Sequence, residues 1–257
     1  MTHRIIARMD IKQSHLIKGI QMEGWRKIGD PVAYANKYYN EHADEIFCVD
    51  VVASLYQRNN LLKIIQKIAG QCFIPMTVGG GIDSVDSASM LLTSGADKVA
   101  LNTAATKNPD LLNQISSRFG QQALVLNLES KKTAPGKWTV LTDNGRNRTG
   151  LDAIEWAAEA VTRGVGEIMI NSIDRDGTNQ GPDLDLIRAI SSVVSVPIVY
   201  AGGISRCEHA LDALSMGINA VAIGTGLHYE HMKILELKNY LAQANLSVRP
   251  QPILATL

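Results

Sequence analysis

The chain has 257 residues, 46% of them apolar, which is enough to bury a large core. Its 25 basic and 25 acidic residues give a formal net charge of zero, which excludes the strongly basic surface typical of a dedicated nucleic-acid-binding protein. No apolar run approaches the ~18 residues that a membrane-spanning helix needs, so we expect no membrane segment.

Short apolar runs rich in Val and Ile alternate with longer segments of helical period along the whole chain. The predicted strands, in chain order, are 4–10, 45–53, 74–80, 98–104, 123–129, 167–174, 196–203 and 220–226. The predicted helices between them include 31–43, 60–70, 85–96, 109–120 and 151–164. Runs that are apolar on both faces are typical of a parallel sheet covered by helices. The pattern predicts a closed (β/α)8 TIM barrel that forms a single domain over residues 1–257, with an open doubly wound sheet as the alternative.

The second half of the chain repeats the first at a fixed distance. The matching segments share an offset of 122 residues and are 44–52 with 166–174, 78–82 with 200–204, and 95–103 with 217–225. Three matches at one offset predict two fused half-barrels of four βα units each. The first and fifth strands should then correspond as well. Asp10 and Glu129 are therefore equivalent positions, although their offset of 119 requires a short insertion nearby.

Each predicted half-barrel carries a glycine cluster at the end of its third strand and small polar residues at the end of its fourth. The candidate residues are Gly81, Asn102 and Thr103 in the first half, and Gly203, Gly224 and Thr225 in the second. Backbone without Cβ atoms can approach an anion closely and point several N–H groups at it. One such cluster is explained equally well by a tight βα turn. Two clusters related by the repeat favour a pair of phosphate cradles and a small substrate that carries two phosphates.

Asp10 and Glu129 end the first and fifth strands, which lie on opposite sides of an eight-stranded ring. Both carboxylates are therefore expected to face the space above the barrel axis. Paired carboxylates in one site suit general acid–base catalysis, because one can stay protonated while the other is ionised. The alternative is that they only cap a following turn or bind a lysine.

The sequence SIDRDGT at 172–178 places Asp174, Asp176 and Gly177 at the end of the sixth strand. No histidine accompanies these carboxylates at metal-ligand spacing, which favours hydrogen bonding to the substrate over a metal site. The three cysteines of the chain are far apart and show no metal or redox spacing, which fits a reducing compartment. We therefore expect no metal, no cofactor and a cytoplasmic location.

The segment 13–30, between the first strand and the first helix, is too long for a plain βα turn. Loops beyond roughly 12 residues are usually functional or disordered. Because this one contains several glycines and Lys18, it is expected to form a mobile flap that closes over an anionic substrate.

Charged residues stand at the start of the first, second, fourth and sixth predicted strands. They are Arg4, Glu45, Lys98 and Glu167. In a barrel they would surround the bottom of the axis, opposite the phosphate cradles. Isolated solvated charges before strands are also common, so the residues alone leave both interpretations open.

Taken together, these residues resemble the cyclase subunits of imidazole glycerol phosphate synthase, over nearly the whole chain. The most specific stretches are DIK at 10–12, KG at 18–19, TVGGGI at 77–82, GADKVALNTAA at 95–105 and SIDRDGT at 172–178. The resemblance implies a glutaminase partner, a class I glutamine amidotransferase, at the N-terminal face of the barrel. It also implies that ammonia crosses the barrel and adds to a formimino ribonucleotide with two phosphates. The products would be imidazole glycerol phosphate and aminoimidazole carboxamide ribotide.

The same resemblance assigns roles to the candidate residues. Asp10 and Glu129 would be the catalytic acids and Lys18 the lysine of the flap. The implied phosphate contacts are Gly81, Asn102, Thr103, Gly177, Gly203, Gly224 and Thr225. The implied gate for ammonia is Arg4, Glu45, Lys98 and Glu167.

One departure bears on the reaction, because Glu129 stands where the family has aspartate. The extra methylene moves the carboxylate by roughly 1 Å, and a misplacement of that size can cost about 100-fold in rate. The flap is also similar to a paralogous branch associated with amidation of surface-polysaccharide sugars, in which a barrel binds a glutaminase and passes ammonia to a separate amidotransferase. That role is the alternative function. Isomerase chemistry is a third possibility, but it gives no reason for a four-charge gate.

Overall fold

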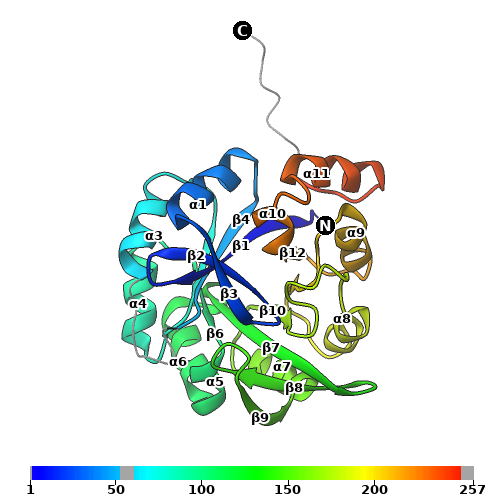
Figure 1. Cartoon of the computed structure of the whole chain (residues 1–257). Helices are drawn as coiled ribbons and strands as arrows, with labels where there is room; N and C mark the ends of the chain where they lie inside the picture. Colours follow the sequence, from blue (N-terminus) through cyan, green and yellow to red (C-terminus); the bar gives the residue numbers. More distant parts are fainter. Residues whose placement is uncertain (1, 53–60, 250–257) are drawn as a thin grey trace.

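The computed structural model describes residues 2–52 and 61–249, so the last residue of the predicted strand 45–53 and the first of the predicted helix 60–70 lie outside the described residues. The described chain is built on a closed barrel of eight parallel strands (Figure 1). In order around the ring they are β1 (Arg4–Lys12), β4 (Glu45–Asp50), β5 (Met76–Gly79), β6 (Lys98–Leu101), β7 (Leu124–Ala134), β10 (Glu167–Ser172), β11 (Ile198–Ala201) and β12 (Ala220–Ile223). The predicted (β/α)8 barrel is confirmed. An open sheet is excluded, because β7 pairs with β10 and β12 pairs with β1.

Helices connect the strands and surround the barrel (Figure 1). They are α1 (Pro31–Asn40), α3 (Leu61–Ala69), α4 (Val85–Thr93), α5 (Thr103–Lys107), α6 (Asp110–Phe119), the 3₁₀ helix η1 (Gln121–Ala123), α7 (Ala153–Thr162), α8 (Leu184–Ser191), α9 (Cys207–Leu214), α10 (Thr225–His228) and α11 (Ile234–Gln243). Helix α3 illustrates the packing, because Leu61, Ile65 and Ile68 recur at helical spacing and are buried in the core between barrel and helices.

Side chains along each strand alternate between the two sides of the barrel wall. On β1, Ile5, Ala7 and Met9 join the core under the helices, whereas Ile6 belongs to a second core inside the barrel. The inner core is completed from the other strands by residues that include Phe47, Ala100, Val125, Met169, Val199 and Ala220. Apolar side chains therefore fill the middle of the barrel, and polar side chains are confined to its two ends.

Two β-hairpins extend the barrel beyond the ends of β1 and β7. Strands β2 (His15–Ile20) and β3 (Glu23–Gly29) follow β1, and strands β8 (Lys137–Thr142) and β9 (Asn147–Asp152) follow β7. The sequence interpretation of 13–30 as a loop is therefore wrong. The first strand of each hairpin pairs antiparallel with the end of the barrel strand before it. This pairing satisfies the backbone hydrogen bonds that a loop would leave to water.

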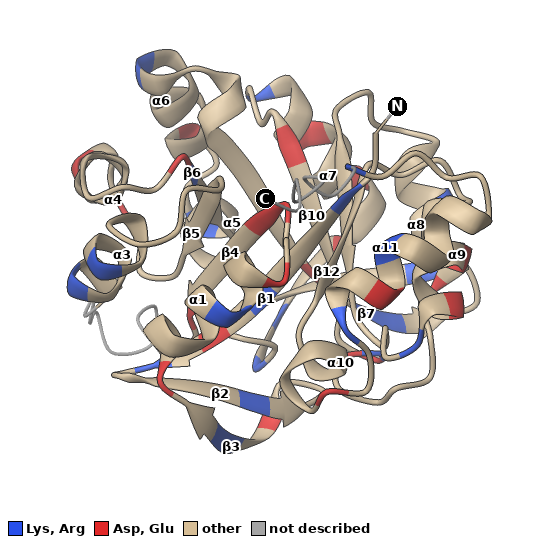
Figure 2. Ribbon diagram, turned by 90° about the horizontal axis from the view of Figure 1, so that it is seen from above, with Lys and Arg blue, Asp and Glu red and all other residues tan. Residues whose placement is uncertain are grey.

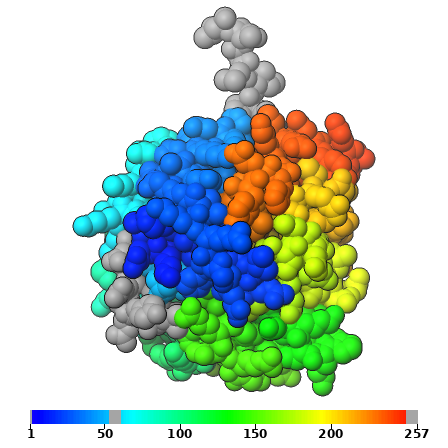
Figure 3. All heavy atoms as spheres, viewed as in Figure 1, coloured from blue at the N-terminus to red at the C-terminus, as the bar shows by residue number. Residues whose placement is uncertain are grey.

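The two hairpins meet over the mouth of the barrel. Met22, at the turn of the first hairpin, is buried with Leu141 of the second and with Ile173 after β10. The indole of Trp25 on β3 lies within 5.3 Å of the guanidinium of Arg146 in the β8–β9 turn. In Figure 3 the blue first hairpin covers the middle of the visible face and borders the green and yellow-green segments.

The half-barrel repeat extends to these hairpins and their helices. At the offset of 122, the bounds of β2, β4, β5, β6 and α1 reproduce those of β8, β10, β11, β12 and α7. Both helices begin after an aspartate cap: the Asp30 carboxylate accepts from the N–H of Ala33, and the Asp152 carboxylate accepts from Ile154 and Glu155. The predicted equivalence of Asp10 and Glu129 thus fits a repeat that covers nearly every element.

Charge is dispersed over the described surface, with basic and acidic residues interspersed on the ribbon (Figure 2). This distribution agrees with the zero formal charge of the chain. Within residues 2–52 and 61–249, no helix is both long enough and apolar enough to cross a bilayer.

Candidate active site

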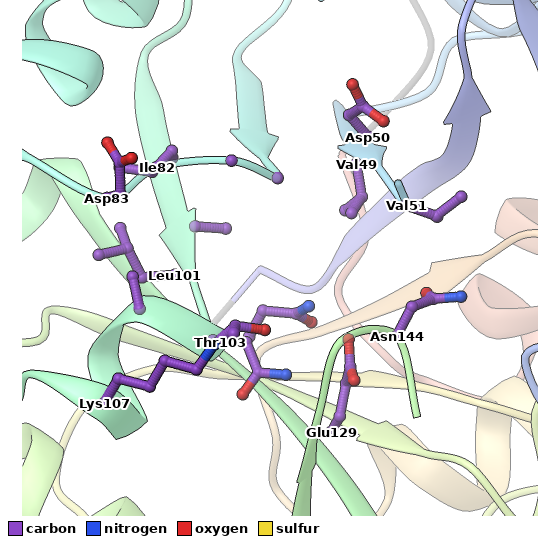
Figure 4. A pocket seen from close by; sticks show the side chains of 16 residues that line it. Val49, Asp50, Val51, Ile82, Asp83, Leu101, Thr103, Lys107, Glu129 and Asn144 are labelled. Atoms are coloured by element: carbon purple, nitrogen blue, oxygen red, sulfur yellow. The ribbon is translucent and has the colours of Figure 1, made fainter. Parts of the chain in front are cut away.

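A cavity of about 210 Å³ opens at the ends of β4, β5, β6 and β7. Its lining includes the predicted Gly81, Asn102, Thr103 and Glu129, and also Asn144 from the turn between β8 and β9. In Figure 4 the Glu129 side chain projects from β7 into this space, between Thr103 and Asn144. Gly81 has a φ of +69°, a conformation that residues with a Cβ rarely adopt. The cavity brings together the residues predicted for the first cradle, and is called the first cradle below.

The second cradle lies at the ends of β10, β11 and β12, and is much narrower. Its free space is only about 10 Å³, and its lining includes all the residues predicted for it: Asp176, Gly177, Gly203, Gly224 and Thr225. A Cβ on Gly203 would lie 2.2 Å from the carbonyl oxygen of Gly181, and one on Gly177 would lie 2.4 Å from that of Gly19. Glycine is therefore required at both positions by close backbone approach.

Lys18 accounts for the narrowness of the second cradle. It is buried, and its ammonium donates to Asp176 at 2.6 Å and to Asp10 at 3.2 Å. The hairpin that carries it is fastened to the same loop, because the N–H of Gln21 donates to the carbonyl of Asp176 at 2.8 Å. The structure therefore places the predicted flap lysine inside the site, with its hairpin docked over the second cradle.

Asp174 does not take part in either cavity. Its carboxylate instead accepts a hydrogen bond of 2.7 Å from the N–H of Lys132 on β7. This bond joins two neighbouring strand ends, and the expected contact of Asp174 with the substrate stays a prediction.

Asp10 and Glu129 experience opposite electrostatic environments. Although burial disfavours its charged form, the cations of Arg8 and Lys18 hold the pKa of the Asp10 carboxyl far below its usual value. Glu129 forms no ion pair within the described residues, and Arg8 and Asn102 offset its burial only in part. Burial raises the pKa of Glu129 to about 7, and Asp10 adds to the shift, although the carboxylate accepts a 2.8 Å hydrogen bond from the N–H of Gly145. One acid is thus fixed as an anion, and the other can exchange a proton near neutral pH.

Arg8 is a residue of this site that sequence reasoning missed. Its guanidinium lies inside the barrel mouth, where Nε donates to Asp10 at 3.0 Å, and only 4% of the residue is exposed. The sequence contained an indication of this position. Side chains two or four residues apart on a strand share a face, so Arg4, Arg8 and Asp10 lie on one face of β1. Asn127 and Asn171 were missed in the same way, two buried amides on the inward faces of β7 and β10.

At the opposite end of the barrel, the structure brings the four predicted charges into one closed ring. Arg4 binds both Glu45 and Glu167, and the Lys98 ammonium also binds both, at 3.1 and 2.7 Å. The hydroxyl of Thr77 donates to Glu45 as well. Isolated solvated charges are therefore excluded as an interpretation. The function of the ring as a gate stays a prediction.

The potential metal-ligating side chains are dispersed in the described part of the chain. There, no group of three or more His, Cys, Asp or Glu side chains is arranged to hold a metal ion. The acids of the mouth are paired with Arg8, Lys18 and the backbone of Gly145 instead.

The fold and the site define a (β/α)8 barrel of two half-barrels, each of which contributes a glycine-lined cavity and a buried acid to the mouth. Residues 4–233 match the model of the histidine biosynthesis protein family, and the chain belongs to this family. Within it, the chain is similar to the imidazole glycerol phosphate synthase subunit HisF of Legionella pneumophila. The two are 53% identical over 205 residues, which cover 80% of this chain and 97% of that protein. This similarity supports the cyclase subunit and does not favour the paralogous amidation role.

Proposed function

We propose that this chain is the cyclase of an imidazole glycerol phosphate synthase and uses ammonia to convert the two-phosphate formimino ribonucleotide into imidazole glycerol phosphate and aminoimidazole carboxamide ribotide. One observation carries the proposal: two buried carboxylates with unlike partners meet at one mouth, Glu129 in the lining of the first cradle and Asp10 bonded to Arg8 and Lys18 of the second. The cradles suit the two terminal phosphates of one extended substrate, with Gly81, Asn102 and Thr103 at one end. The other end is bound by Gly177, Gly203, Gly224 and Thr225.

In the proposed mechanism, Glu129 transfers protons and Asp10 remains an anion. When ammonia attacks a carbon of the substrate, its nitrogen becomes positively charged and must lose a proton. Glu129, with a pKa of about 7, can accept that proton and return it to the amine that departs as the second product. Asp10 stays ionised throughout and stabilises the positive charge that develops on nitrogen.

The reaction is tested directly with the purified chain, the formimino ribonucleotide and ammonium chloride at pH 8.5. We expect loss of the substrate absorbance and stoichiometric formation of both products. A matched reaction without ammonium should show none. If the chain binds the ribonucleotide tightly but does not turn it over in either reaction, the cyclase proposal is wrong.

We further propose that a glutaminase binds at the N-terminal face and delivers ammonia through the charged ring. Support comes from the ring itself, because Arg4, Glu45, Lys98 and Glu167 surround the barrel axis below the apolar interior layer. Ammonia is neutral and small, so an apolar interior admits it more readily than it admits ammonium ion.

Replacement of Lys98 by methionine should separate the two sources of ammonia. The change removes one of the two cations that bridge Glu45 and Glu167 and leaves Arg4 as their only cationic partner among the described residues. We expect glutamine-dependent turnover with the partner to change by roughly tenfold, and ammonium-dependent turnover to stay within about twofold. Lys63→Met on the exposed face of α3 is the control. Equal losses in both assays would make Lys98 a purely structural residue.

A further inference from the structure

Arg8 carries more hydrogen-bonding capacity than its partners use. Its Nε donates to Asp10, but Nη1 is fully buried and has no hydrogen-bond partner within the protein. Buried polar atoms are nearly always satisfied, and an unpaired donor on a charged group is costly. Asp10 and Asp176 balance the charges of Arg8 and Lys18, but they leave this guanidinium nitrogen without a partner.

The unpaired nitrogen belongs to a residue that lines the second cradle. Arg8 lies there with Gly203, Gly224 and Thr225. The hydroxyl oxygen of Thr225 is likewise buried without a partner within the protein. Two unsatisfied polar atoms, from β1 and from the start of α10, thus belong to one small space. An oxyanion satisfies both, since it can accept from the guanidinium and from the hydroxyl together.

Lys18 and Arg8 differ in how they are held. Lys18 belongs to the hairpin, and its side chain passes Gly224, where a Cβ would lie 3.7 Å from Lys18 Cδ. Arg8 belongs to the barrel wall, where the flanking Ala7 pairs with Ile223 and Met9 with Cys48. Withdrawal of the hairpin would remove Lys18 from the cradle and leave Arg8 in place. The described lining of the first cradle has one cation, Lys107, which is exposed.

We propose that Arg8 is a fixed anion-binding residue of the second cradle, whose free guanidinium nitrogen donates to an oxygen of the substrate phosphate bound there. This inference rests on the proposed two-phosphate substrate. It adds a contact from Arg8 that distinguishes the binding sites of the two phosphates. The second cradle binds its phosphate through a buried charge, whereas the first relies on backbone amides, Asn102 and Thr103.

The test is calorimetric titration of the whole chain with inorganic phosphate at constant ionic strength. We expect two sites in the unaltered chain, and in Arg8→Met a loss of roughly tenfold or more in affinity at one site only. The control is Lys238→Met, which removes another cation that is 4% exposed and paired with a buried aspartate, Asp44, far from both cradles. It should leave both phosphate affinities within about twofold.

If Arg8→Met does not fold, the charge-balanced double variant Arg8→Met with Asp10→Asn replaces it, and Asp10→Asn alone is its reference. Equal affinity in the variant and its reference, or equal weakening of both sites, would overturn the role of Arg8. Absence of any phosphate binding by the unaltered chain would overturn this inference and the two-phosphate substrate together. Two intact phosphate sites without turnover of the ribonucleotide would contradict only the proposed reaction.

Discussion

Replacing Glu129 by glutamine should lower kcat by about 10²- to 10⁴-fold, with little change in KM. Glutamine keeps the length of the side chain and an oxygen that can accept from the N–H of Gly145, but it cannot exchange a proton. In the unaltered chain kcat should rise with pH through about 7, because Glu129 must be ionised to accept the proton. The measurement is a kcat–pH profile at a constant concentration of free ammonia, and the limb near pH 7 should be absent from the residual activity of the variant.

The same substitution should stabilise the fold above neutral pH. Burial raises the pKa of Glu129 from its ordinary 4.5 to about 7, so the folded chain binds a proton that the unfolded chain has released. The free energy of unfolding therefore falls as pH rises from about 4.5 to 7. Above pH 7 the loss is constant at roughly 3 kcal/mol. Glu129→Gln should exceed the unaltered chain in free energy of unfolding at pH 8 and equal it near pH 4.5. Equal stability at both pH values would contradict the raised pKa.

Glu129→Asp tests whether the longer side chain matters. Glu129 accepts a hydrogen bond of 2.8 Å from the N–H of Gly145. The carboxylate of an aspartate at this position would lie roughly 1 Å further away. We expect kcat to fall by about 100-fold, because the turn that carries Gly145 is placed for glutamate. A rise in kcat would instead show that the site retains the geometry of an aspartate.

Replacing Asp10 by asparagine should abolish detectable turnover and lower the free energy of unfolding by about 3–5 kcal/mol. The variant loses the anion that stabilises positive charge in the reaction, and it leaves the buried cations of Arg8 and Lys18 with too few counter-ions. Because the folded pKa of Asp10 is depressed, the stability difference should be complete above the ordinary carboxyl pKa near 4. It should shrink as pH falls below that value. Urea unfolding at several pH values measures it.

The matched control for Asp10 is Asp44→Asn. Asp44 is also buried and bonded to a buried lysine, Lys238, at 2.6 Å, but it lies away from both cradles. This variant should lose comparable stability while its folded fraction keeps full turnover. If Asp10→Asn retains the turnover of Asp44→Asn, Asp10 serves the fold and not the reaction.

The barrel was predictable because its strands are short, apolar on both faces and repeated at one offset. The cradles followed from the same repeat, since glycine at a strand end is a local signal that survives without tertiary information. The hairpins were missed because β2 and β3 extend past the barrel, where their burial does not alternate and the sequence HLIKGI resembles an apolar loop. Their stability comes from pairing with β1 and from docking on the 173–177 turn, which are contacts between distant segments.

Arg8 shows a second limit of sequence reasoning. In the sequence, an arginine between an alanine and a methionine is compatible with an exposed position. Its burial follows only once one face of the strand is known to contact the helices and the other to line the barrel interior. Its inward direction follows from the period of β1, but its environment depends on Asp176, more than 160 residues later. The opposite pKa shifts of Asp10 and Glu129 were equally beyond sequence reasoning, because they arise from the burial of each carboxyl and from the cations that the fold brings to it.

If both cradles bind phosphate as proposed, their unequal space should give the substrate a direction of entry. The first cradle is open, whereas the second lies beneath a docked hairpin whose lysine occupies it. We therefore expect the substrate to arrive with one end leading and to anchor that end beside Asn102 and Thr103. The trailing phosphate can then displace Lys18 and free its ammonium from Asp10. We therefore expect a molecule with two chemically similar ends to bind in a single orientation, although the two halves of the barrel are nearly symmetric.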